Sequence, residues 1–129
     1  MIRLLSLPAL FLALFAAAAA AAAQTKPPAA PQYWVTYAYD ASTGSWGLGW
    51  GKTDRQATIN DALSRCAKPG CKAGDVTLGR CIASAQGTQK GVWFGTGNDA
   101  ETAKGNALRF CRAGPAGSTC EALAVRCAG

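Results

Sequence analysis

The chain has 129 residues, with 13 lysines and arginines against 7 acidic residues and no histidine, which gives a formal net charge of +6. The lack of histidine excludes the Ser–His and Cys–His pairs that activate a nucleophile. The positive charge favours anionic partners such as an acidic protein or phospholipid headgroups, although it can also serve solubility alone.

The N-terminal segment is typical of an export signal. Arg3 precedes an apolar run over 4–15 and an alanine run over 16–23 that offers small-residue cleavage sites. We therefore expect a signal peptide over 1–23, cleaved before Gln24. The alternative is an uncleaved membrane anchor, since about 20 apolar residues can span a bilayer.

The rest of the chain is expected to form one domain after a short linker. Residues 24–31 contain three prolines and no apolar periodicity, which predicts an extended linker. Residues 32–129 remain as a single small domain, and export places it in the periplasm or outside the cell, away from nucleic acid. We expect no integral membrane span after cleavage of the signal.

The first half of this domain alternates in a way that predicts two strands, a helix and a third strand. Tyrosine or valine at 33, 35, 37 and 39 alternates with Trp34, Thr36 and Ala38, and aromatic or leucine positions alternate with three glycines over 46–51. A helix is predicted over 53–67, with Thr53 and Gln56 as a capping box. A strand is predicted over 71–78.

The second half repeats this order. The segment 99–111 aligns with 54–66, so that an Ala-Leu-x-x-Cys pattern ends a predicted helix in each copy. The second helix is predicted over 98–113, with Asn98 as its cap, and strands over 80–85, 91–96 and 120–127. The sequence thus predicts an α+β fold: a duplicated strand-strand-helix-strand unit with a mainly antiparallel sheet and two helices covering one face.

Six cysteines in a short exported chain predict a disulfide framework. Six cysteines allow 15 pairings, and the repeat favours the one in which each helix end is joined to the following strand. That gives Cys66–Cys71 and Cys111–Cys120, and leaves Cys81–Cys127. The loose spacing and the lack of histidine argue against zinc, and we expect neither a metal nor any other cofactor.

The aromatic residues are the most informative candidates for a binding surface. Core packing is their default role, but a partly exposed row could anchor a protein or stack on sugar rings. The glycines over 47–51 alternate with large residues inside a strand, unlike a phosphate-binding loop. Asp61 and Asp75 could form a hydrolytic pair, but nothing in the sequence supports that pairing. The candidate surface residues are Tyr37, Tyr39, Trp46, Trp50 and Trp93.

The combination of these motifs resembles a known family. A Trp-Gly-x-Gly-Trp-Gly stretch at Trp46–Gly51, a capped helix ending Ala-Leu-x-x-Cys and a strand beginning at Cys71 occur in sequence, and the pattern recurs more weakly from Val92 onward. This resembles the small secreted bacterial proteins of domain-of-unknown-function family 4189. The resemblance implies export and a duplicated fold, and it supplies no catalytic residues.

Two functions remain as expectations. The first is a non-enzymatic protein-binding module of the periplasmic inhibitor or immunity type, a role that other small exported bacterial proteins of this general build perform. The second is a cell-envelope glycan binder that uses Trp46, Trp50 and Trp93 as stacking platforms. The expected partner in the first case is a protein, and the positive charge favours an acidic one.

Overall fold

A computed structural model describes residues 29–129. The predicted signal peptide over 1–23 and the first part of the predicted linker lie outside these residues. Residues 29–33 carry no helix or strand before β1 begins. Among the described residues, no helix is long and apolar enough to cross a bilayer.

The first half forms one small sheet and one helix. Strand β1 (Trp34–Tyr39) pairs antiparallel with β2 (Trp46–Lys52), and α1 (Arg55–Cys66) follows. Two short strands, β3 (Lys72–Ala73) and β4 (Thr77–Leu78), then pair with the other edge of β1. Strand β2 is therefore left as an edge of this sheet.

The second half repeats this plan. Strand β5 (Cys81–Gln86) lies between β6 (Trp93–Gly97) and β7 (Glu121–Cys127), and both pairings are antiparallel. Helix α2 (Ala100–Ala113) follows β6, and a short 3-10 helix, η2 (Gly117–Thr119), leads into β7. Strand β7 is an edge of the second sheet, as β2 is of the first.

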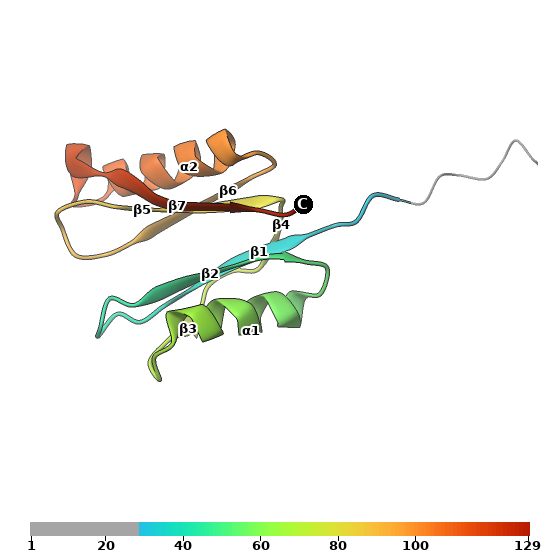
Figure 1. The fold of residues 1–129 in the computed structure, drawn as a ribbon. Coiled ribbons are helices and arrows are strands. Elements are labelled where there is room, and N and C mark those ends of the chain that lie inside the picture. The colour runs from blue at the N-terminus through green and yellow to red at the C-terminus, as the bar shows by residue number, and fades with distance from the viewer. Residues whose placement is uncertain (1–28) are drawn as a thin grey trace, which may run out of the picture.

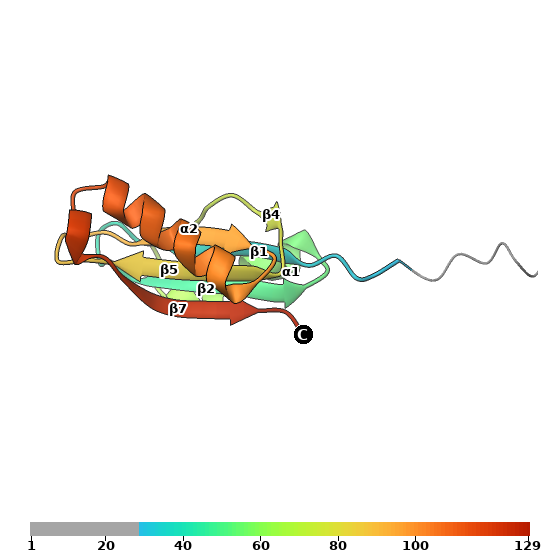
Figure 2. The same cartoon turned by 90° about the horizontal axis from the view of Figure 1, so that it is seen from above.

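The two sheets stack face to face, and each helix covers the outer face of its own sheet (Figures 1 and 2). This corrects the prediction of one sheet with both helices on the same face, whereas the predicted antiparallel pairing is confirmed. The α+β class and the two helices are confirmed. The physical reason for the layers is that both faces of β2 need cover: the glycine face receives a helix, and the face with the large side chains receives the other sheet.

The glycines allow each helix to lie very close to its sheet. A Cβ on Gly47 would fall within 3.0 Å of backbone atoms of Ala62, Arg65 and Cys66 on α1. A Cβ on Gly95 would meet the backbone of α2 at Ala103, Asn106 and Ala107 in the same way. The glycine face of one strand in each half therefore allows the close approach of a helix.

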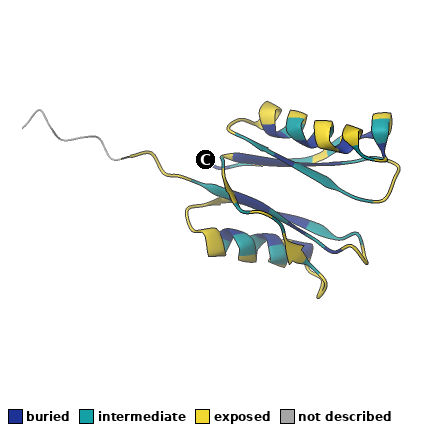
Figure 3. Ribbon diagram, turned by 180° about the vertical axis from the view of Figure 1, so that it is seen from behind, coloured by how far each residue is buried: buried dark blue, intermediate teal, exposed yellow. Residues whose placement is uncertain are grey.

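The space between the sheets holds the central core. Val35, Leu48 and Ile82 are buried there, with half-buried aromatic residues packed around them. The Tyr37 and Phe94 rings, one from each sheet, stack with centroids 3.9 Å apart and an angle of 8° between their planes. Figure 3 shows buried strands in the middle and exposed residues on the outer sides of the helices.

The helix caps lie one residue later than predicted. Asp54, rather than Thr53, caps α1 by accepting from Gln56 N at 3.0 Å. Asp99, rather than Asn98, caps α2 by accepting from Thr102 N at 2.8 Å. The positive end of the helix dipole also stabilises a carboxylate at the cap, which explains why the two aspartates cap the helices in place of Thr53 and Asn98.

The strand predicted over 71–78 is split into β3 and β4. Gly74 packs against the Tyr37 ring, where a Cβ would collide with the ring carbons. The Thr36 hydroxyl donates to the Asp75 carbonyl oxygen at 2.9 Å. These two contacts hold 74–76 out of the ladder, so that the strand pairs with β1 only at its ends.

The three disulfides are those that the repeat favours. Cys66 is bonded to Cys71 and Cys111 to Cys120, so that each helix end is tied to the strand or loop after it. Cys81 is bonded to Cys127 and joins β5 to β7. All six cysteines are used, which is typical of a protein of an oxidising compartment.

Candidate functional site

Two grooves follow the open sides of the sandwich. The first lies at the edge formed by β2 and β7 and encloses about 150 Å³. We call it the arginine groove. Its lining comes from both halves and consists of Trp46, Gly47, Leu48, Trp50, Arg65, Ala124 and Arg126.

Trp50 is the centre of the arginine groove. Its indole is half-buried, and its ring lies 4.2 Å from the Arg65 guanidinium carbon and 5.7 Å from that of Arg126. Arg65 reaches it from α1 and Arg126 from β7, so that both halves of the molecule build the site. Stacking of a guanidinium on an indole is attractive because the ring face is negative. The site thus combines an aromatic platform with two cations.

The second groove lies around Tyr37 and Tyr39 of β1, and we call it the tyrosine groove. Both tyrosines line two neighbouring hollows of about 290 and 510 Å³. The smaller hollow is completed by Val92, Trp93, Phe94 and Phe110. The larger one is completed by the loops on either side, at Asp40, Ala41, Ser42, Gly70, Lys72, Ala73 and Gly74.

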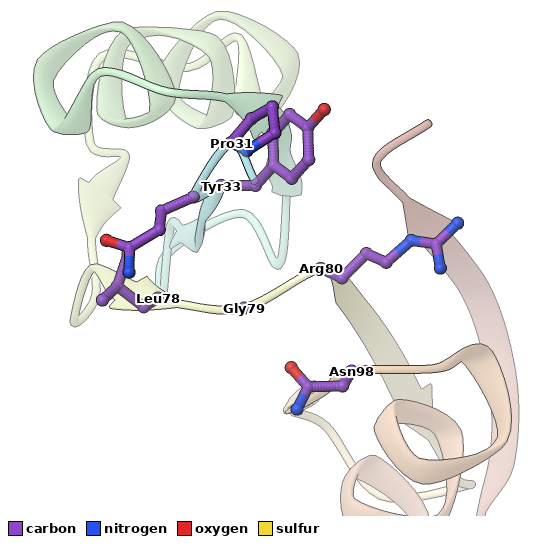
Figure 4. Close-up of a pocket in the computed structure, with 7 residues that line it drawn as sticks. Pro31, Tyr33, Leu78, Gly79, Arg80 and Asn98 are labelled. Carbon is purple, nitrogen blue, oxygen red and sulfur yellow. The ribbon is translucent and has the colours of Figure 1, made fainter. Parts of the chain in front are cut away.

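A third hollow of about 290 Å³ lies between the two halves near the N-terminal end of the described chain. Figure 4 shows Pro31, Tyr33 and Leu78 on one side and Asn98 on the other, with Arg80 turned away toward the C-terminal strand. There the Arg80 Nε–H donates to the Ala128 carbonyl oxygen at 3.0 Å. The arginine is committed to the fold, so this hollow has no converging set of functional groups.

The structure divides the predicted aromatic surface between the two grooves. Trp46 and Trp50 lie in the arginine groove, whereas Tyr37, Tyr39 and Trp93 lie in the tyrosine groove. Trp93 packs against Gly91 and Gly114 beside α2, on the opposite face of its strand from Phe94. The three tryptophans that we expected to act together as stacking platforms are therefore not brought together.

Arg126 and Phe110 are the site residues that sequence reasoning missed. Phe110 is 47% exposed at the rim of the tyrosine groove. Strand alternation places Ala124 and Arg126 on one face of β7, and the duplicated topology would have directed that face toward β2. The missing information was that the two sheets stack.

Several carboxylates are engaged in local structure. The Ser42 hydroxyl, which donates to Asp40 at 2.7 Å, holds the pKa of that carboxyl below its ordinary value. The Thr102 backbone N–H, followed by the Thr102 hydroxyl, lowers the pKa of Asp99 in the same way. The Asp61 Oδ2 atom lies 3.6 Å from the Arg65 Nε atom, in an ion pair along α1. Asp75, its proposed partner, is exposed in the loop between β3 and β4.

No group of metal-ligating side chains occurs within residues 29–129.

The family comparison gives one result: the model for "Domain of unknown function (DUF4189)" matches residues 34–127. No curated protein and no solved structure matches the chain. The match covers every strand and both helices of the duplicated sandwich, and the chain belongs to the DUF4189 family.

Proposed function

We propose that this chain is an exported, non-enzymatic protein-binding module of the periplasmic inhibitor or immunity type, and that its partner docks on the arginine groove. The observation that carries the proposal is the Trp50 indole, whose ring lies 4.2 and 5.7 Å from the guanidinium carbons of Arg65 and Arg126, in an open groove built by both halves. Tryptophan and arginine, together with tyrosine, are enriched among the residues that dominate protein–protein binding energy.

The size of the groove favours a protein side chain over a small molecule. Its volume of about 150 Å³ is below the roughly 300–1,000 Å³ of typical small-molecule sites. Next to the groove, β7 is an edge strand, and its Leu123 is 48% exposed. An anchor pocket with an apolar neighbour on an edge strand suits a protein loop.

The scaffold supports an inhibitor or immunity role. Three disulfides and two closely packed helices hold the groove in place before a partner arrives. Such preorganisation lowers the ordering cost of binding. The proposal of a non-enzymatic role rests on the engagement of Asp40, Asp54 and Asp99 in turns and caps.

A glycan-binding role is the second candidate, and one observation favours it. The tyrosine groove joins two hollows of about 290 and 510 Å³ through Tyr37 and Tyr39, which gives it a larger volume than the arginine groove. An extended aromatic groove suits a polysaccharide chain better than a single side chain. This role would use Tyr39 and Phe110, since the Tyr37 ring is covered by Phe94 and Gly74.

Two matched variants separate the candidates. Trp50→Leu removes the indole of the arginine groove and retains an apolar group, and Phe110→Leu makes the corresponding change at the tyrosine groove. The mature protein and both variants are immobilised and exposed to envelope extract, and the retained protein is identified, purified and tested for direct binding. In parallel, each is sedimented with purified peptidoglycan.

The protein-binding proposal requires direct binding that is lost in Trp50→Leu and kept in Phe110→Leu. Sedimentation with peptidoglycan that is lost only in Phe110→Leu would replace it with the glycan-binding role. If both variants retain the envelope protein as the wild type does, the contact surface lies outside both grooves.

A further inference from the structure

The two arginines of the arginine groove share one aromatic ring. Their guanidinium carbons lie 4.2 and 5.7 Å from the Trp50 ring centroid, so that they are at most about 10 Å apart, which is about one Debye length at 0.1 M salt. Each cation therefore lies within the field of the other. The indole face offsets part of this repulsion, but it adds no negative charge.

The neighbours of these arginines leave part of their hydrogen-bonding capacity free, and only Arg65 has an acidic partner. The Arg65 Nε atom lies 3.6 Å from the Asp61 Oδ2 atom, and 49% of the arginine side chain is exposed. Arg126 is exposed, and its Nη1 donates to the Val125 carbonyl oxygen at 3.0 Å. In the described part of the chain, no acidic side chain lines the groove itself.

An anion in the groove would relieve the repulsion and use the remaining N–H groups. Guanidinium groups are planar forks that match the two oxygens of a carboxylate, and such charge-assisted hydrogen bonds are stronger than neutral ones. The small volume of the groove restricts the ligand to one compact acidic group. The apolar floor at Leu48 and Ala124 suits the methylene stem of an amino-acid side chain.

We propose, on the basis of the proposed function above, that Arg65 and Arg126 form a carboxylate clamp over Trp50 that receives an aspartate or glutamate side chain from a loop of the partner protein. The guanidiniums bind the carboxylate, and the indole and Leu48 contact its stem. The partner is thus identified by an exposed acidic residue at the centre of its contact surface.

The clamp can be tested with a short peptide in place of the partner. The probe is a blocked pentapeptide, Gly-Ser-Glu-Ser-Gly, and its matched control has glutamine in place of the glutamate. Each is titrated into the isotope-labelled mature protein while the indole N–H resonance of Trp50 is followed by NMR. We expect a saturable shift with the glutamate peptide and none with the glutamine peptide, and weaker binding as salt rises.

Arginine variants test whether binding of the peptide depends on Arg65 and Arg126 in particular. Arg126→Ala and Arg65→Ala should each weaken the glutamate peptide about tenfold, the loss expected for a charge-assisted hydrogen bond. Arg126→Lys should recover only part of the affinity, because lysine lacks the planar fork. Arg109→Ala is the matched control, since Arg109 stacks on Phe110 at 5.3 Å, outside this groove, and should bind as the wild type does.

Several outcomes would overturn the clamp. They are equal binding of the glutamine peptide, equal losses in Arg109→Ala, or preference of the same arginines for inorganic phosphate or phosphatidylglycerol vesicles. The experiments also distinguish a failure of the carboxylate clamp from a failure of the protein-binding role. If the peptide does not bind while Trp50→Leu still loses the envelope partner, the clamp is wrong and the protein-binding role stands. If the peptide binds and no envelope protein is retained, the protein-binding role is wrong.

Discussion

At the residue scale, glycine on the helix-facing side of the strands determines how the layers pack. Gly47 and Gly49 lie against α1, and Gly95 and Gly97 lie against α2. The facing helix positions are also small, as at Ala62, Ala103 and Ala107, all fully buried. At Gly47 and Gly95 the nearest helix atoms are all backbone atoms, so no side chain can move aside there. Gly49 and Gly97 also meet the side chains of two helix threonines.

Replacing one of these glycines tests that packing. Gly95→Ala should destabilise the protein by about 1–3 kcal/mol, the usual cost of overpacking, because the new methyl group would meet the α2 backbone at Ala103 and Ala107. Gly105→Ala is the control: nothing lies within 4 Å of its Cβ position on α2. It should stabilise the helix by about 0.5–1 kcal/mol. Denaturant unfolding measures both, and equal effects would contradict the packing account.

The single-residue predictions succeeded where a local pattern was sufficient. The alternation over 46–51 correctly separated the glycine face of β2 from its large side chains. The same alternation over 92–97 places Trp93 with Gly95, on the face opposite Phe94, and this separates it from Trp46 and Trp50. Half-burial of Trp50 did not follow from the pattern, because it depends on α1 and β7 reaching the same edge.

At the scale of elements, the helices and disulfides were predictable because they depend on short-range spacing. Both helices occur within two residues of their predicted bounds, and the repeat gave the three cysteine pairs. The strand over 71–78 was predicted as continuous, and it is not. Its interruption depends on Thr36 and Tyr37, which are distant in sequence. Contacts of this kind leave no periodic signal.

The disulfides should differ in their contribution to stability. Cys66 and Cys71 are 5 residues apart, whereas Cys81 and Cys127 are 46 apart. The loop-entropy estimate gives about 2 kcal/mol for the short loop and about 4 kcal/mol for the long one. We therefore expect the Cys81→Ala/Cys127→Ala double variant to unfold at lower denaturant than Cys66→Ala/Cys71→Ala. The reverse order would show that strain or residual structure, rather than loop length, dominates.

The cap of α2 should make this helix sensitive to acid. The hydrogen bonds from Thr102 favour the ionised form of Asp99 and hold its pKa below the ordinary value of 3.8. The stabilisation is therefore fully present above that value and is lost as pH falls through the lower pKa of the folded state. Asp99→Asn retains an acceptor that does not titrate.

The measurement is the melting temperature between about pH 6 and pH 2, a range that spans the ordinary pKa of aspartate. We expect the wild type to lose more stability than Asp99→Asn over this range. Parallel profiles for the two proteins would contradict a role for the Asp99 charge at the cap.

At the scale of the whole molecule, the layer between the sheets joins two similar halves into one structure. Ile82 of β5 is fully buried there and packs with Val35 and Leu48 of the first sheet. The prediction of one duplicated domain required only the repeat. The stacking of the two sheets depends on contacts between halves, which neither copy of the repeat contains by itself.

The shared layer predicts cooperative unfolding. Ile82→Ala should cost about 2–5 kcal/mol, and hydrogen exchange should show equal loss of protection in α1 and α2, because both halves depend on the same core. Ile82→Val is the milder control, at about 0.5–1.5 kcal/mol. Protection lost in α2 alone would show that the halves are independent folding units.

The central claim is that the edge formed by β2 and β7 is a protein contact surface. Photo-crosslinking in the cell that naturally produces the protein tests this claim with the partner that the cell supplies. Leu123 and Phe110 are suitable positions for p-benzoylphenylalanine, because they are exposed to 48% and 47% and lie on β7 and α2 respectively. We predict a protein adduct from position 123, none from position 110, and loss of the adduct when Trp50→Leu is added. An adduct from position 110 alone, or one at position 123 that Trp50→Leu leaves unchanged, would contradict the account.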